Sequence, residues 1–139
     1  MSEENLQRVR EQYARYNAGE RVPGRWFWHE DAEYHTARED PDHAAHRGID
    51  AIAKLFASWL EAYPDLRLEI QQAEARGDKV FLWIRFTGHG AASGIPLQME
   101  LAHVCTLRDG KAVSVVEYSD RDEALAAVGL SETRFLESE

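Results

Sequence analysis

Two stretches of the chain carry apolar residues at helical spacing. The apolar positions within residues 6–16 recur three and four residues apart, which predicts a helix over about residues 3–17. The same spacing at positions 52–63 predicts a longer amphipathic helix that opens after Gly48. We expect Asp50 to cap this second helix, because its carboxylate can accept hydrogen bonds from the free N–H groups of the first turn.

The segment between these two helices has a less regular pattern. Pro23 suits the first turn of a short additional helix that would carry the aromatic residues 26–28. Residues 31–36 predict a short strand, and the charged stretch at 37–47 predicts a loop.

After Pro64 the apolar period falls to two, which is the period of a strand. Four strands are expected, separated by turns or loops, at residues 66–71, 80–86, 97–107 and 113–118. A last short helix follows at residues 121–128. Helices followed by sequential strands indicate an α+β domain with an antiparallel sheet. We therefore expect one domain over residues 1–130, with an acidic tail at 131–139.

The expected strand over residues 97–107 has two faces of different polarity. Its odd-numbered face is apolar apart from His103, and its even-numbered face carries Gln98 and Glu100. One helical layer cannot easily cover both faces of the sheet. We therefore expect the even-numbered face to line a half-polar cavity, and the odd-numbered face to form a homodimer through the sheet.

Length and charge narrow the classes of partner. The chain has 139 residues and an apolar fraction of 44%, which suits a single domain with a real core. Lys and Arg total 16 against 25 Asp and Glu, and the net charge is -9. This balance argues against nucleic acid or an anionic membrane as partner, because both need clustered positive charge. The polar N-terminal segment has no apolar signal core, so we expect a cytoplasmic protein.

Several residue types that could carry chemistry also have an ordinary structural explanation. Cys105 and His103 share one strand face, where an imidazole could activate a thiolate, but a strand cysteine in an apolar run is typical of a small buried hydrophobe. His43 and His46 are three apart beside Asp40, but their stretch predicts a loop and no spacing fixes a third metal ligand. We therefore expect no metal, and no motif points to a cofactor.

Five short sequence phrases carry a resemblance to a known family. They are YARYNAGE at 13–20, DAEYH at 31–35, DPDHAAHRGIDAI at 40–52, LRDGK at 107–111 and EYSDRDEALAAVGL at 117–130. These phrases, and the order of helices followed by strands, resemble the SnoaL-like branch of the nuclear transport factor 2-like superfamily. The resemblance implies a conical α+β barrel, usually a homodimer, with a cavity between the helices and the concave face of a curved sheet.

The superfamily that the chain resembles includes steroid isomerases, polyketide cyclases, epoxide hydrolases and dehydratases. The fold therefore does not predict the reaction, and the residues of the site have to be compared with each class in turn. The position of the isomerase base falls at Thr36, which cannot act as a base near neutral pH. The position of the isomerases' protonated aspartate falls at Ala102, and that of their tyrosine near Gln12 and Tyr13. Two of these three roles lack a suitable residue, and we do not expect steroid isomerisation.

The polyketide cyclases carry a histidine on the penultimate strand and an acid on the last. His103 and Glu117 are similarly placed, with Asp120 as a second acid. The isomerase comparison, however, puts Glu100 and Ala102 in the cavity, and alternation then turns His103 away unless a β-bulge changes the register. His103 is therefore either catalytic or part of a dimer interface. Glu100 and Glu117 are either a functional carboxylate pair or groups at the solvent-exposed rim.

The sequence thus predicts a small-molecule-binding protein of unassigned activity, with an apolar aromatic cavity. The residues expected to line the cavity are Trp26, Tyr34, Phe56, Trp59, Trp83 and Glu100.

The alternative is a cofactor-independent acid/base enzyme of the cyclase, isomerase, dehydratase or epoxide hydrolase type, acting on a small apolar oxygenated substrate. In that enzyme Tyr13 would donate a hydrogen bond, and Glu117 or Asp120 would act as base. An enzyme should hold at least one carboxylate or imidazole that is desolvated, partnered and turned towards the cavity.

Overall fold

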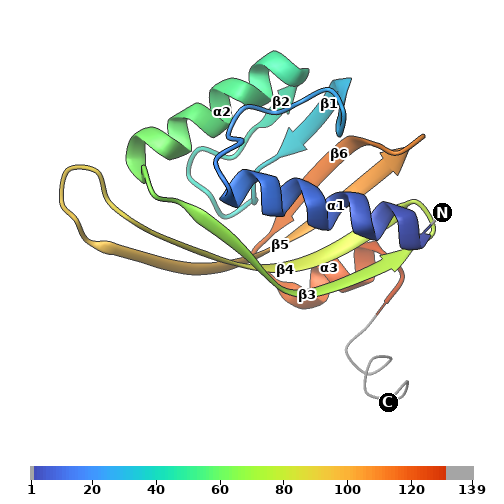
Figure 1. Cartoon of the computed structure of the whole chain (residues 1–139). Helices are drawn as coiled ribbons and strands as arrows, with labels where there is room; N and C mark the ends of the chain where they lie inside the picture. Colours follow the sequence, from blue (N-terminus) through green and yellow to red (C-terminus); the bar gives the residue numbers. More distant parts are fainter. Residues whose placement is uncertain (1, 131–139) are drawn as a thin grey trace.

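The computed structural model describes residues 2–130, and the acidic tail predicted at 131–139 lies outside them. Three helices and a six-stranded sheet within this range form the expected α+β fold (Figure 1). The helices are α1 (Ser2–Asn17), α2 (Ile49–Ala62) and α3 (Arg121–Ala127). The strands are β1 (Trp28–His35), β2 (Ala45–Arg47), β3 (Arg67–Arg76), β4 (Lys79–His89), β5 (Pro96–Arg108) and β6 (Lys111–Tyr118).

The sheet is mixed, whereas the sequence predicted an antiparallel one. Its strand order is β2-β1-β6-β5-β4-β3, and β3 to β6 pair antiparallel in sequence order as expected. β1, however, pairs parallel with β6, with Tyr34 opposite Val115. The reason is that α2 carries the chain from the β2 edge to the opposite edge, where β3 begins. The last strand therefore returns to lie beside the first.

Helices cover both faces of the curved sheet. α1 packs on β3 and β4, and α2 packs on β1 and β2, so both lie on the concave side (Figure 1). α3 packs on the opposite side against β4, β5 and β6. The sequence suggested a second subunit as the cover for one face of the sheet, whereas the short C-terminal helix covers part of the face opposite α1 and α2.

The short helix predicted for residues 26–28 is absent from the structure. Gly24 O accepts hydrogen bonds from the backbone N–H groups of Phe27 and Trp28, which makes a turn, and Trp28 already begins β1. Ala112 N donates to Phe27 O, so the backbone of this segment is tied to β6 and not to a helical turn.

The region that leads into α2 also differs from the prediction. The N-cap of α2 is Gly48, at a positive φ of 89°, and no side chain caps the helix. Asp50 lies two positions further on, inside the first turn, where a carboxylate still interacts favourably with the helix dipole. The expected loop at 37–47 ends in β2, which pairs with β1.

The register of β5 decides which of its residues face the interior, and it reverses the expectation from the sequence. Ala102 and Val104 pack in a small cluster with residues of α3, whereas Cys105 and Leu107 belong to the main core under α1 and α2. Pairing with β4 is regular from Pro96 to Thr106, and the one irregularity in the pairing of β5 with β6 lies between Thr106 and Leu107. No bulge therefore alters the alternation at His103. The odd-numbered face therefore turns inwards and does not form the proposed dimer surface.

Candidate functional site

Four buried polar side chains from four different elements meet in the interior, and we call them the polar cluster. They are Tyr13 of α1, Tyr34 of β1, His103 of β5 and Glu117 of β6, and each is between 1 and 8% exposed. The Tyr13 hydroxyl lies 2.6 Å from His103 Nδ1, and the Tyr34 hydroxyl lies 3.0 Å from His103 Nε2. Tyr34 also donates to Glu117 Oε2 at 2.6 Å. The meeting follows from the fold, because His103 and Glu117 are direct partners across β5 and β6.

One arrangement of protons satisfies the whole polar cluster with a neutral imidazole. Tyr13 donates to His103 Nδ1, and His103 Nε2–H donates towards Tyr34 and towards Glu117 Oε2 at 3.3 Å. Tyr34 then donates its own proton to Glu117. The backbone N–H of Ala37 donates to the other carboxylate oxygen of Glu117 at 3.3 Å.

The surroundings set the protonation of these groups. Burial alone would raise the pKa of Glu117, but its contacts with His103, Tyr34 and the Ala37 N–H outweigh burial and hold that pKa below its usual range. Burial, followed by nearby Cys105 for Tyr13 and by Glu117 for Tyr34, raises the pKa of both phenols well above their ordinary value. At neutral pH the cluster therefore presents one carboxylate held by protonated donors.

The space between α1, α2 and the concave face of the sheet, beside the polar cluster, is nearly filled by side chains. The inner hollow, enclosed by Tyr13, Tyr34, His103 and the rings of Trp28 and Phe56, has a volume of about 20 Å³. That is room for about one water molecule. The deep cavity expected from the sequence is therefore not found between α1 and the sheet.

A larger cavity, which we call the mouth cavity, opens next to the inner hollow. It lies between α2, the segment after β1 and the β4–β5 hairpin, which extends past the helices (Figure 1). Its volume of about 400 Å³ is within the usual range for sites that bind small molecules. Its apolar wall includes Trp59, Tyr63, Leu66, Phe86, Met99 and Leu101. Its polar lining is Thr36, Glu39, Asp40, Ser58, Glu117 and Ser119.

The structure brings six of the predicted site residues together. Tyr13, His103, Glu117 and Tyr34 form the polar cluster, and Phe56 and Trp59 stack beside it with ring centroids 5.0 Å apart. Trp59 lines both the inner hollow and the mouth cavity. Glu117 lines the mouth cavity and is therefore the point where the polar cluster meets it. His103 is buried inside the fold and is not part of a dimer interface.

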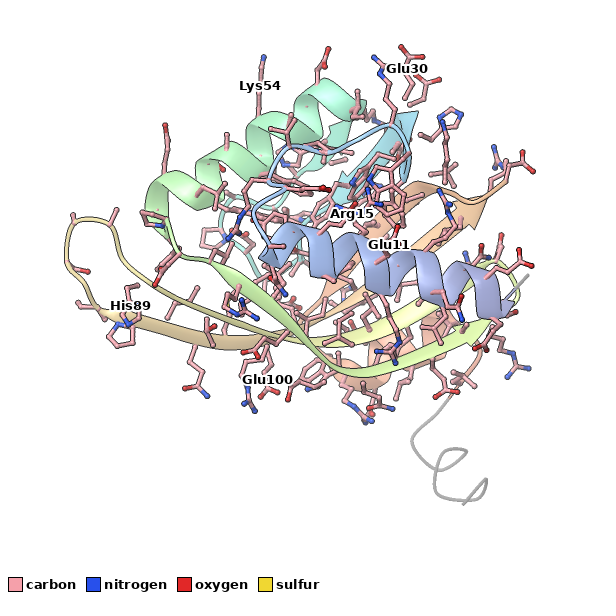
Figure 2. The ribbon with its side chains drawn as sticks, viewed as in Figure 1. Glu11, Arg15, Glu30, Lys54, His89 and Glu100 are labelled. Atoms are coloured by element: carbon pink, nitrogen blue, oxygen red, sulfur yellow. The ribbon has the colours of Figure 1, made fainter. Side chains whose placement is uncertain are left out.

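Trp83 and Glu100 do not line the cavity, and their assignment to its wall is corrected. Both lie on the outer face of the sheet, where Trp83 Nε1 donates to Glu100 Oε2 at 3.1 Å. In Figure 2, Glu100 lies on the side of the sheet away from α1 and α2. The cause is the alternation along β5, which turns Ala102 and Glu100 outwards when His103 turns inwards.

Asp120 and Trp26 also lie away from both hollows. Asp120 is the N-cap of α3, and its carboxylate accepts from the backbone N–H groups of Asp122 and Glu123. Trp26 lies under the guanidinium groups of Arg8 and Arg15, which are 5.3 and 4.2 Å from its ring centroid. These two residues stabilise local structure, and we no longer place them in the site.

Several residues that line the mouth cavity could not be identified from the sequence. The alternation of Leu97, Met99 and Leu101 predicts one shared apolar face and favours a dimer surface, because no local pattern shows that the face turns into a cavity of the same chain. Glu39 and Ser119 come from connecting segments and hydrogen bond to each other at 2.7 Å. No sequence pattern brings these two segments together.

The region of His43 and His46 has a structural explanation in the fold. His43 Nδ1 lies 2.7 Å from the backbone oxygen of Thr36, which ties the loop to the end of β1. Within residues 2–130, no group of three or more His, Cys, Asp or Glu side chains could hold a metal ion. No helix in the same range is long and apolar enough to cross a membrane.

The structure is that of an α+β domain with a ligand-sized cavity. Two helices lie on the concave side of its curved sheet, and a buried polar cluster lies beside the cavity. The chain belongs to the SnoaL-like domain family, whose sequence profile matches residues 9–115. The family predicted from the sequence is thereby confirmed. Among curated protein sequences, none matches this chain significantly.

Solved structures resemble the whole domain. Bal32a, from a soil-derived mobile gene cassette, is 21% identical with a TM-score of 0.74, over 84% of this chain and 88% of its own. A protein of Catenulispora acidiphila with a ketosteroid isomerase-like fold, in complex with trimethylamine, is 21% identical with a TM-score of 0.70, over 89% and 93%. TerC, co-crystallised with polyporic acid, is 19% identical with a TM-score of 0.72, over 90% and 97%. At these identities the likeness establishes the fold.

Proposed function

We propose that the protein binds a small, largely apolar molecule in the mouth cavity, with Glu117 at the polar end of the site. The observation that carries this proposal is the cavity itself, which has about 400 Å³ of space between aromatic and aliphatic walls and a few polar groups. Such a lining gives affinity through apolar burial and orientation through a small number of hydrogen bonds. Two structural relatives hold small organic molecules, trimethylamine in one and polyporic acid in the other, which supports a small ligand here.

The test is to fill the cavity without disturbing the core. Ala62 and Ala57 are both exposed on α2, but only Ala62 lines the mouth cavity. A thermal-shift screen with steroids, polyketide fragments and terpene epoxides should find stabilising compounds, since a ligand at a hundred times its dissociation constant stabilises by roughly 2.7 kcal/mol. Ala62→Trp should abolish this stabilisation, and Ala57→Trp should preserve it. Equal stabilisation of both variants would place the ligand elsewhere.

The cofactor-independent acid/base enzyme is the second candidate, and one observation keeps it under consideration. Glu117 is 7% exposed, partnered and turned towards the mouth cavity, which is the condition expected of a catalytic carboxylate. The lowered pKa of Glu117 argues for binding instead, because it makes the carboxylate a weak base near neutral pH. Deuterium uptake into a bound ketone in heavy water, lost in Glu117→Gln, would overturn this preference.

We also propose a homodimer formed through the sheet and a cytoplasmic location. The inward turn of the odd-numbered face of β5 leaves the outer face as the surface for the dimer, where Trp83 is only partly buried. Sedimentation that shows a monomer at micromolar concentration would contradict the dimer.

Cell fractionation would test the proposed cytoplasmic location, and recovery of the protein outside the cytoplasmic fraction would contradict it.

A further inference from the structure

We propose that the ligand of the mouth cavity carries a protonated amine on an apolar body, and that the cavity rejects carboxylates. This inference rests on the proposed function and specifies its ligand. It follows from the charges that line the cavity, from the position of the nearest cations and from the aromatic groups of the wall.

The polar end of the mouth cavity offers negative charge and hydroxyl groups. Three of its polar lining residues are the carboxylic acids Glu39, Asp40 and Glu117. The others are Thr36, Ser58 and Ser119, whose hydroxyls already bond to backbone or to Glu39. Among the described residues that line this cavity, none is Lys, Arg or His. A ligand carboxylate would thus meet like charges with no basic side chain in the lining itself, since the nearest ones, Arg38 and His43, lie in the neighbouring hollow beside α3.

The cationic groups closest to this end of the cavity are engaged elsewhere. Arg38 lines a neighbouring hollow beside α3, which shares Thr36, Glu39 and Glu117 with the mouth cavity, and its guanidinium makes two 2.8 Å hydrogen bonds to Glu123. His43 lies in the same hollow, with its Nδ1 2.7 Å from the backbone oxygen of Thr36. His103 lies behind Glu117, away from the cavity. Even a protonated His103 would neutralise only Glu117 and leave the charges of Glu39 and Asp40.

The wall of the cavity suits a cation as well as an apolar body. Trp59, Tyr63 and Phe86 contribute aromatic rings to the lining, and the faces of such rings attract alkylammonium groups. A protonated amine can also donate up to three hydrogen bonds to carboxylate oxygens. The molecules named with two relatives are an amine, trimethylamine, and an acid, polyporic acid, so the relatives indicate no common ligand charge. The charge preference is therefore inferred from the residues that line the cavity of this chain.

The experiment compares three ligands that share one apolar body and differ in charge. Naphthylethylamine, naphthylethanol and naphthylacetate are titrated into the full chain at pH 7 by calorimetry. We expect the amine to bind at least about tenfold more tightly than the acid, with the alcohol between them. An acid that binds as tightly as the amine would overturn this inference and leave the proposed function standing. Failure of all three to bind would contradict both.

Matched variants locate the source of the preference. The double variant Glu39→Gln/Asp40→Asn removes two exposed carboxylates from the cavity rim and should weaken amine binding about tenfold. Binding of naphthylethanol should change less than about twofold. The control Glu69→Gln/Glu74→Gln removes the same charge from β3, outside the lining, and should leave both affinities unchanged. An equal loss of amine binding in the control would show a general charge effect and overturn the inference.

Discussion

Replacing Tyr34 with phenylalanine would remove one oxygen atom from the polar cluster and leave the ring in place. The Tyr34 hydroxyl is 2.6 Å from Glu117 Oε2 and 3.0 Å from His103 Nε2, in a side chain that is 2% exposed. A hydrogen bond to a charged group is worth about 1.5–3 kcal/mol, and one to a neutral group about 0.5–1.5 kcal/mol. Glu117 keeps its longer contacts with His103 and the Ala37 N–H. We therefore expect Tyr34→Phe to lower the free energy of unfolding by about 2–4 kcal/mol.

Urea denaturation followed by tryptophan fluorescence and far-UV circular dichroism measures this loss. In a thermal melt the same change should lower Tm by roughly 10 °C for a domain of this length. Tyr118→Phe is the control, because Tyr118 lies at the end of β6 outside the polar cluster, and it should change stability by less than about 0.5 kcal/mol. A Tyr34→Phe variant as stable as the Tyr118→Phe control would refute the view that this hydroxyl stabilises Glu117.

Two further predictions concern ionisable groups. Because the pKa of folded Glu117 lies below its unfolded value of about 4.3, the ionised group contributes stability above that pH, and this contribution is lost as the pH falls through the folded pKa. Glu117→Gln should therefore flatten the decline of the unfolding free energy between about pH 5 and 3, and an unchanged decline would contradict it. Burial raises the pKa of the Cys105 thiol to about 12, so Ellman's reagent at pH 8 should not label the native protein but should label one thiol in urea. Rapid labelling of the native protein would show that Cys105 is accessible.

The sequence predicted which residues of β5 share a face, but it could not predict which face is buried. Alternation alone groups His103 with Leu101 and Cys105, and it separates them from Ala102 and Glu100. The choice between the faces depends on where α3 packs, since Ala102 is buried in a cluster with Ala124 and Leu125 of this helix. The helix itself was predicted correctly, but its docking surface is a tertiary property.

The polar cluster was partly predictable and the mouth cavity was not. His103 and Glu117 fall on two strands joined by a tight turn, so their proximity follows from antiparallel pairing. Tyr34 joins them only because β1 lies beside β6, a pairing between distant segments that no local pattern reveals. Glu39 and Ser119 reach the cavity through connecting segments whose path depends on that same pairing.

The parallel pairing of β1 with β6 also affects how the protein can be made. During synthesis the ribosome releases residues 28–35 long before residues 111–118, and the earlier strand must wait for its neighbour. Until then Tyr34 has no carboxylate to bind, and the edge of β1 that will pair with β6 has no partner. Closure of this long loop is an entropic cost that precedes the contacts it allows, so we expect the domain to complete its fold only after β6 has been synthesised.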